Sequence, residues 1–243
     1  LPLQGVLAPK ANLFTQVSGG TSAQLLARDL RQAAADPGVR AIVLDIDSPG
    51  GSVFGTPELA ATVRQVAADK PLVAHTDGLM ASAAYWVGSA ANAVWAAGPT
   101  VSVGSIGIYA RLSWSPASDT TLEVVRGKYK RLALNGQRPD ADALAHAEAQ
   151  LDELYRVFVH AVAAHRGVSA DEVLERMADG RTFIGRQAAE AGLVDGFAPL
   201  ADLVARIGAE PGAFAQRRRA RFGALAGADA AALRGALAAA MVP

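Results

Sequence analysis

Residues 41–51 read Ala41-Ile-Val-Leu-Asp-Ile-Asp47 and then Ser48-Pro-Gly-Gly51. The first part is short, β-branched and mostly apolar, which is typical of a buried parallel strand. The glycines that follow leave bare backbone N–H groups at the carboxyl end of this strand, the edge at which α/β sheets bind ligands. As structure alone, the paired glycines are a turn; beside a reactive side chain they mark a site.

The segments on either side continue an alternation of helices and strands. A helix is expected over residues 21–35, with Thr21 or Ser22 as its cap, and another over 57–68, with Pro57 in its first turn. Leu72 to Thr76 is the next strand, which completes a strand, helix, strand crossover unit. Beyond it, the patterns predict helices over 81–91, 140–166 and 168–177, strands over 93–96, 101–109 and 121–125, and extended pieces at 183–185 and 192–195 around one more helix.

This alternation predicts an α/β domain with a mostly parallel sheet over residues 1–207. From about Glu210 the chain changes character and becomes rich in alanine, leucine and arginine. Residues 208–243 are therefore expected to form a C-terminal extension that is helical or mobile. The arginine cluster at 217–221 fits a solvated linker, with docking onto an acidic partner as the alternative.

Composition excludes several classes of protein. The 243 residues carry 23 acidic and 23 basic side chains, which speaks against a nucleic-acid partner or an anionic membrane surface. Cysteine is absent, so disulfides, thiolate zinc sites and a cysteine nucleophile are excluded. No apolar run approaches the roughly 20 residues of a membrane span. We expect a soluble protein without a transmembrane segment, although the chain opens on Leu1 and an upstream segment could have been trimmed from it.

Ser82 is the candidate nucleophile. It lies at the start of a predicted helix between Ala81 and Ala83, and these small neighbours leave its hydroxyl accessible. A helix N-terminus also supplies N–H donors that favour developing negative charge. The alternative is that Ser82 only caps the helix, and for a lone serine that interpretation would win.

A serine needs a base to become a nucleophile. None of the histidines, at positions 75, 146, 160 and 165, has an acidic partner at a recognisable spacing, so a Ser-His-Asp triad has no support in the sequence. Lysine is the other solution, because burial can lower its pKa. Of the four lysines, Lys130 is the leading candidate, since Tyr129 and Leu132 favour partial burial, and Lys128 is its rival.

Four motifs together resemble the signal peptide peptidase A (protease IV) family, and within it most closely the phage protein C type proteases of capsid assembly. In chain order they are Asp45-Ile-Asp-Ser-Pro-Gly-Gly-Ser-Val53, Ala81-Ser-Ala-Ala-Tyr-Trp86, Gly104-Ser-Ile-Gly107 and Gly127-Lys-Tyr-Lys130. The resemblance implies a fold similar to Clp protease and crotonase. It also implies Ser82 as nucleophile, Lys130 as base, Ser105 as support for that lysine, and the N–H groups of Gly51 and Ala83 as oxyanion hole, with no metal or cofactor.

The function implied is a serine endopeptidase that forms homo-oligomers and cleaves a scaffolding or portal protein in an assembling phage head. Its place would then be the host cytoplasm or the prohead interior. A bacterial enzyme that degrades cleaved signal peptides, associated with the membrane or periplasmic, is the first alternative. The others are a crotonase-like acyl-CoA enzyme and an assembly protein that has lost activity, against which intact Ser82 and Lys130 argue.

Overall fold

The computed structural model describes residues 1–11, 19–111 and 138–216. The chain divides into two compact units. The first contains Leu1–Ile106 and the residues from Val159 on, and the second contains Gly107–Phe158. The described part of the second unit consists mainly of the first turns of helix α5 (Ala141–Arg166), whose last residues belong to the first unit. All the elements below belong to the first unit.

Strands and helices alternate along the first unit, as the sequence predicts. The strands are β1 (Pro2–Ala8), β2 (Thr21–Ser22), β3 (Ile42–Gly51), β4 (Leu72–Thr76), β5 (Leu79–Ala81), β6 (Ala93–Ala96), β7 (Ser102–Gly104), β8 (Thr182–Ile184) and β9 (Gly196–Phe197). The helices are α2 (Ala23–Ala35), α3 (Thr56–Asp69), α4 (Ala83–Ser89), α6 (Ala170–Arg176), α7 (Arg186–Glu190), α8 (Leu200–Ala209) and the 3₁₀ turn η1 (Pro211–Phe214).

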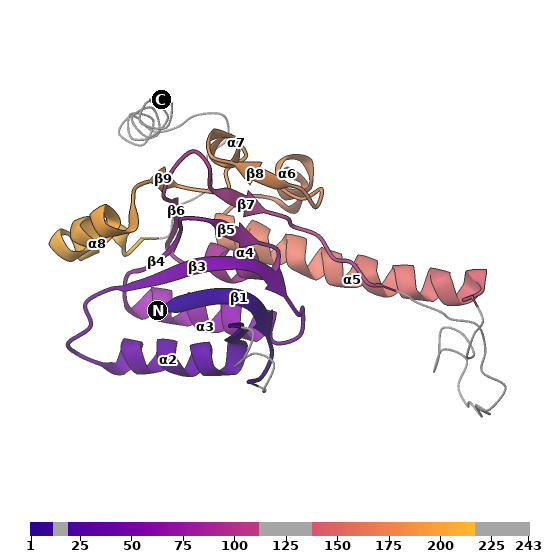
Figure 1. Ribbon diagram of the computed structural model, residues 1–243, viewed down its shortest axis with the longest axis horizontal. Coiled ribbons are helices and arrows are strands. Elements are labelled where there is room, and N and C mark those ends of the chain that lie inside the picture. Colours follow the sequence, from indigo (N-terminus) through magenta and orange to yellow (C-terminus); the bar gives the residue numbers. More distant parts are fainter. Residues whose placement is uncertain (12–18, 112–137, 217–243) are drawn as a thin grey trace. The chain divides into compact units, whose positions relative to one another are not determined.

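The strands form a sheet in the order β8-β7-β5-β3-β4-β6-β9, with β1 and then β2 joined to β3 off this path. Every pairing is parallel except that of β7 with β8. The predicted α/β class with a mostly parallel sheet is therefore confirmed. Figure 1 shows β3 as the long central strand of this unit.

Besides β1, strand β3 pairs with β4 and β5, each along a different part of its length. Its first residues pair with β4, and Ser48 farther along pairs with Met80 of β5. The predicted strand ended at Asp47, but β3 continues to Gly51 because Val6 and Leu7 of β1 pair with its two glycines. The carboxyl end of β3 is thereby held between β1 and β5, directly before helix α3.

Helices cover both faces of the sheet. Helices α2 and α3 lie side by side along β1 and β3 (Figure 1), and Gly88 brings α4 against Met80, Ile46 and Ala74 on the same layer. On the other face, α8 and η1 close a core around Trp95; this cluster contains Val73, Ala93, Trp95, Ala198, Leu203, Ile207 and Phe214. Burial of such apolar faces is what holds the layers together.

Several element boundaries differ from the predictions. The strands at 72–76 and 93–96 are confirmed, and Ser22 and Ser169 cap α2 and α6. Residues 79–81, however, form strand β5, so helix α4 begins only at Ala83. The strand predicted over 101–109 is limited to Ser102–Gly104. Residues 192–195 are a turn, and the strand follows them at Gly196–Phe197.

Helix α8 and η1 extend the described fold to the region of the proposed C-terminal extension. The buried Phe214 packs against Trp95 in a tilted arrangement, with ring centroids 6.1 Å apart. The boundary at residue 207 stays a prediction, and residues 217–243 lie outside the described part of the chain. In the described ranges, no helix is both long and apolar enough to cross a membrane.

Candidate functional site

Ser82 lies in the tight turn between strand β5 and helix α4. Its backbone has φ 53° and ψ −126°, a conformation that residues other than glycine rarely adopt and that costs about 1–3 kcal/mol. Ser82 is the N-cap residue of α4, but its side chain makes no capping hydrogen bond, so capping does not explain its hydroxyl. Strained strand-to-helix turns of this kind carry the nucleophilic serine in α/β-hydrolases.

Ser105 occupies the equivalent position on the neighbouring strand. Ala81 of β5 pairs with Gly104 of β7, so Ser82 and Ser105 follow directly on two adjacent parallel strands. The Ser82 N–H donates to the Gly104 carbonyl at 2.8 Å, and the Ser105 N–H donates to the Arg181 carbonyl at 2.8 Å. Ser105 has φ 52°, and in the described residues these two serines are the only non-glycine residues with positive φ.

Gly50 brings the end of β3 against Ser82. A β-carbon at residue 50 would lie 2.8 Å from the Ser82 β-carbon and 2.9 Å from the Ala83 nitrogen, and Gly50 has φ 96°. Only glycine fits this position, because both the space and the backbone conformation exclude a side chain. The buried Ser48 fixes the approach, since its hydroxyl donates to the Gly5 carbonyl at 2.6 Å and accepts the Gly50 N–H at 3.1 Å.

Gly51 is the last residue of β3. It pairs with Leu7 of β1, and a β-carbon there would collide with the Leu7 backbone, including its nitrogen at 2.7 Å. The Ala83 nitrogen begins helix α4, where the first N–H groups have no partner inside the helix. Gly50, which lies against Ser82 and Ala83, is joined directly to Gly51, so the peptide group that carries the Gly51 N–H begins beside these two residues.

The candidate bases Lys130 and Lys128 both lie outside the described residues. Of the other two lysines, Lys10 is exposed, and Lys70 donates to the carbonyls of Ala33 and Asp36 at the end of α2. Lys70 thus has a structural role.

A histidine with an acidic partner does exist, although no spacing in the sequence indicated it. His75 and Asp45 are register partners on the parallel strands β4 and β3, and His75 Nδ1 lies 3.3 Å from Asp45 Oδ1. The ring is completely buried, and its Nε2 lies 3.2 Å from the Ala198 carbonyl. Because both nitrogens already have partners, the His75–Asp45 pair is not arranged as the base of a Ser-His-Asp triad. His165 is also buried, with Nδ1 3.0 Å from the Ser89 hydroxyl.

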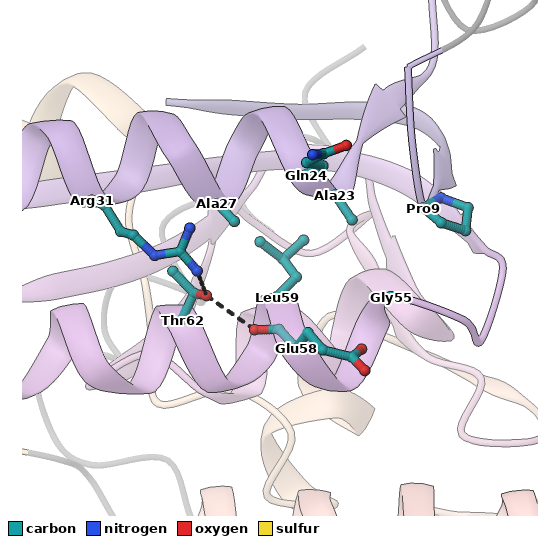
Figure 2. Close-up of a pocket in the computed structure, with 9 residues that line it drawn as sticks. All are labelled: Pro9, Ala23, Gln24, Ala27, Arg31, Gly55, Glu58, Leu59 and Thr62. Atoms are coloured by element: carbon teal, nitrogen blue, oxygen red, sulfur yellow. Dashed lines mark hydrogen bonds between the residues drawn. The ribbon is translucent and has the colours of Figure 1, made fainter.

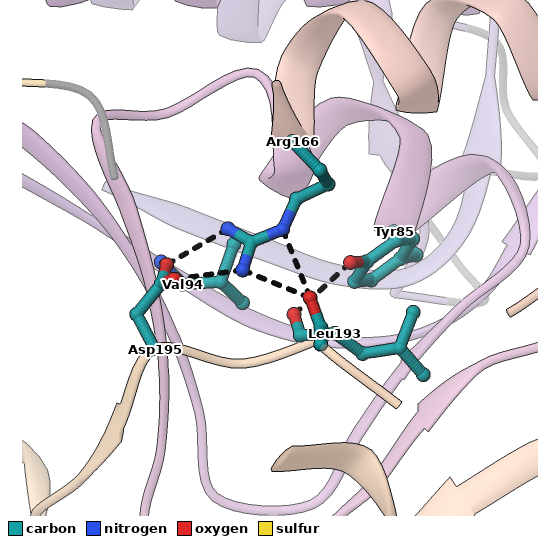
Figure 3. A network of polar contacts seen from close by, with 6 residues as sticks. Tyr85, Val94, Arg166, Leu193 and Asp195 are labelled. Atoms are coloured by element: carbon teal, nitrogen blue, oxygen red, sulfur yellow. Dashed lines mark hydrogen bonds and ion pairs between the residues drawn. The ribbon is translucent and has the colours of Figure 1, made fainter. Parts of the chain in front are cut away.

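The buried ion pair between Arg166 and Asp195 was also not predicted from the sequence. Arg166 is 1% exposed and binds both carboxylate oxygens of Asp195, at 2.7 and 2.8 Å, while Tyr85 donates to the Leu193 carbonyl at 3.0 Å (Figure 3). Burial raises the pKa of Tyr85 more than the nearby Arg166 lowers it, and Asp195 adds a smaller upward effect, so Tyr85 stays a neutral donor. The sequence signal was only an arginine in a largely apolar helix end.

The described residues also contain a small cleft that is separate from these serines. It has a volume of about 230 Å³ and lies between α2 and α3, where Arg31 donates to the Thr62 hydroxyl (Figure 2). None of the predicted site residues lines it. In the same ranges, no group of three or more acidic or histidine side chains is arranged to hold a metal ion.

Comparison with known proteins gives this geometry a context. The model of peptidase family S49 matches residues 64–212, more than half of the chain, a range that contains Ser82, Ser105 and Lys130. The putative protease MJ0651 of Methanocaldococcus jannaschii is 33% identical over 167 residues, which cover 66% of this chain and 52% of that protein.

Two further relatives carry more specific names. Protease 4 of Salmonella typhi is 30% identical over 197 residues, 79% of this chain and 31% of that protein. Capsid assembly protease C of Escherichia phage lambda is 29% identical over 201 residues, 80% of this chain and 45% of that protein. The chain thus spans about half the length of these relatives or less.

Proposed function

Because the chain belongs to peptidase family S49, we propose that it is a serine endopeptidase with Ser82 as nucleophile and Lys130 as general base. The parallel sheet with helices on both faces agrees with the Clp protease and crotonase-like fold expected for it. The observation that carries the proposal is the close approach of Gly50, at the end of β3, to the strained Ser82.

In the proposed acylation step, Ser82 Oγ attacks the carbonyl carbon of the scissile peptide bond while its proton passes to the neutral Nζ of Lys130. The carbonyl oxygen becomes an oxyanion, and the N–H groups of Gly51 and Ala83 donate to it. The tetrahedral intermediate then collapses, and the departing amine takes the proton from Lys130. Water, deprotonated in turn by Lys130, hydrolyses the acyl-enzyme and releases Ser82.

The described geometry supports the oxyanion hole in this scheme. A β-carbon on Gly50 would lie 2.9 Å from the Ala83 nitrogen, and Gly51, whose N–H is the other proposed donor, is the next residue of β3. Two N–H donors near one serine are what the developing charge requires, and one such donor is worth about 3–4 kcal/mol of transition-state stabilisation. Ser105, directly after the strand next to β5, is proposed to orient the Lys130 amino group.

We further propose that the substrate is a scaffolding or portal protein of an assembling phage head, bound as an extended segment. The support is the similarity to capsid assembly protease C and to the head-tail preconnector protein GP5 of Enterobacteria phage P21, which is 31% identical over 201 residues. Homo-oligomers are part of this proposal, with Lys130 supplied by the same protomer or by its neighbour.

Protease 4 of Salmonella typhi and a putative signal peptide peptidase of Enterococcus faecium match with similar identity, 30% and 29%. Cleaved signal peptides are therefore the second candidate substrate.

The test is hydrolysis of casein, candidate head proteins, synthetic signal peptides and an acyl-CoA thioester by purified wild type and by Ser82→Ala. Casein and head proteins should be cut by wild type alone. Cleavage of signal peptides but not of head proteins would assign the second substrate class, and thioester hydrolysis without peptide cleavage would contradict the peptidase proposal.

A further inference from the structure

Arg166 is a fully buried cation near the carboxyl end of α5, and it needs an explanation beyond stability. Its guanidinium is bound by both oxygens of Asp195 and by the Gly192 carbonyl, the latter at 3.0 and 3.2 Å. A buried ion pair often stabilises a protein no better than apolar side chains of the same volume would. What the pair does provide is a fixed geometry, since the planar fork of arginine accepts few arrangements.

The part that this pair fixes is the turn at residues 192–195. Arg166 holds the turn at the Gly192 carbonyl and at the Asp195 side chain. Asp195 is also fastened to strand β6, because its carboxylate accepts the Val94 N–H at 2.7 Å and its own N–H donates to the Val94 carbonyl at 2.7 Å. Leu193 lies between these two anchored residues and has little freedom to move.

Leu193 in turn contacts two residues close to Ser82, Tyr85 in helix α4 and Gly104 in strand β7. Its carbonyl accepts the hydroxyl of Tyr85, which lies one turn after Ser82 in helix α4 (Figure 3). Its side chain lies on the other partner: the Leu193 Cδ1 atom is 3.3 Å from the β position of Gly104. The Gly104 carbonyl accepts the Ser82 N–H.

We propose that Arg166 and Asp195 position the nucleophile by holding Leu193 against Tyr85 and Gly104. This inference rests on the proposed function, in which Ser82 is the reacting residue. Arg166, Asp195 and Tyr85 are positioning residues, because their side chains are almost completely buried. The strained backbone of Ser82 must be held from both sides, by helix α4 and by strand β7, and Leu193 contacts both.

The expected consequence is kinetic. Binding of an extended substrate does not depend on where the Ser82 hydroxyl points, whereas attack on the carbonyl does. A displacement of about 1 Å at a reacting atom can cost about 100-fold in rate. Loss of this support should therefore lower kcat and the rate of acylation while KM stays near its wild-type value.

The experiment measures the second-order rate at which a serine-directed phosphonate labels Ser82, together with kcat and KM for a peptide substrate, on the full chain. Tyr85→Phe removes only the hydroxyl and should slow labelling about 10-fold with KM unchanged. Ser89→Ala is the matched control, because it removes another buried hydroxyl of α4, one that contacts Trp86 and His165 instead of Leu193. Its labelling rate should stay within about twofold of wild type.

The double variant Arg166→Met with Asp195→Leu tests the ion pair without leaving a buried charge unpaired. It should fold and label about 100-fold more slowly. Wild-type labelling rates in Tyr85→Phe would overturn the proposal, whether or not the double variant folds. So would an equal slowing in Ser89→Ala, since the effect would then follow the packing of α4 in general. A wild type that does not label at Ser82 would instead refute the proposed function itself, and this inference with it.

Discussion

The α-carbon of Gly50 lies so close to Ser82 that a β-carbon on residue 50 would stand 2.8 Å from the β-carbon of the serine. Real β-carbons do not approach each other to this distance, so the end of β3 and the turn before α4 fit against one another only because residue 50 has no side chain. The paired glycines are thus a requirement of the site, and several consequences can be measured.

Gly50→Ala should abolish peptide hydrolysis and lower the stability of the protein, since the added methyl group collides with Ser82 and the positive φ is unfavourable for alanine. Gly208→Ala is the matched control, because a β-carbon in helix α8 meets nothing within 4 Å and alanine is the better helix former. Thermal unfolding and casein hydrolysis check both variants. A Gly50→Ala protein with wild-type activity would contradict the close approach.

Lys130→Ala should reduce casein hydrolysis or self-cleavage to background, because Ser82 then lacks a group to accept its proton. Lys128→Ala should keep most of the activity, although it removes the same charge two residues away. The reverse result would transfer the role of base to Lys128.

If Lys130 serves a neighbouring protomer, mixing inactive Ser82→Ala with inactive Lys130→Ala should restore part of the activity. Activity that stays at background in co-assembled mixtures places both residues of the dyad in one protomer.

Asp195→Asn should lower the free energy of unfolding by about 3–5 kcal/mol, because it leaves the buried guanidinium of Arg166 without its counter-ion. Asp29→Asn removes an exposed partner of Arg28 and should cost at most about 1 kcal/mol. Urea denaturation followed by circular dichroism compares the two. Equal effects would show that the Arg166–Asp195 pair contributes no more than a surface pair.

The pH dependence of stability should carry a signature of Tyr85. Its pKa is raised in the folded protein, mainly by burial, so the contribution is complete below the unfolded pKa of about 10 and is lost as pH rises toward the folded value. Between these limits the unfolded chain releases a proton that the folded chain keeps. The free energy of unfolding should therefore fall by at most about 1.4 kcal/mol per pH unit.

Tyr85→Phe should remove this alkaline loss, whereas Tyr109→Phe, at an exposed tyrosine, should leave it unchanged. Urea midpoints measured between about pH 9 and 12 give the slopes. Identical slopes in wild type and Tyr85→Phe would show that Tyr85 is not shielded from water in the folded state.

The sequence predicted the parts of the fold that local pattern determines. The apolar strand at residues 41–47 and the helices on either side follow from periodicity and capping, and their boundaries agree with β3, α2 and α3 within a few residues. The strand β5 was missed, because Leu79–Ala81 is followed by an alanine-rich run that favours a helix by propensity. Its pairing with β7 overrides that preference.

Contacts between distant residues were beyond the reach of the pattern. Asp45 and His75 become partners only through the register of β3 with β4, and Arg166 meets Asp195 only once α5 and the turn before β9 are packed together. The family resemblance implied that Gly51 and Ala83 lie beside Ser82, whereas the close approach of Gly50 to Ser82 emerged from the geometry. The role of Lys130 remains a prediction from sequence.

The most direct test of the account is the identification of the residue that a fluorophosphonate modifies in the full chain, by intact mass and peptide mapping. Wild type should gain one label, on the peptide that contains Ser82, and Ser82→Ala should gain none while it stays folded. A folded, oligomeric wild type that gains no label, or a label that persists in Ser82→Ala, would contradict the assignment of Ser82 as the nucleophile.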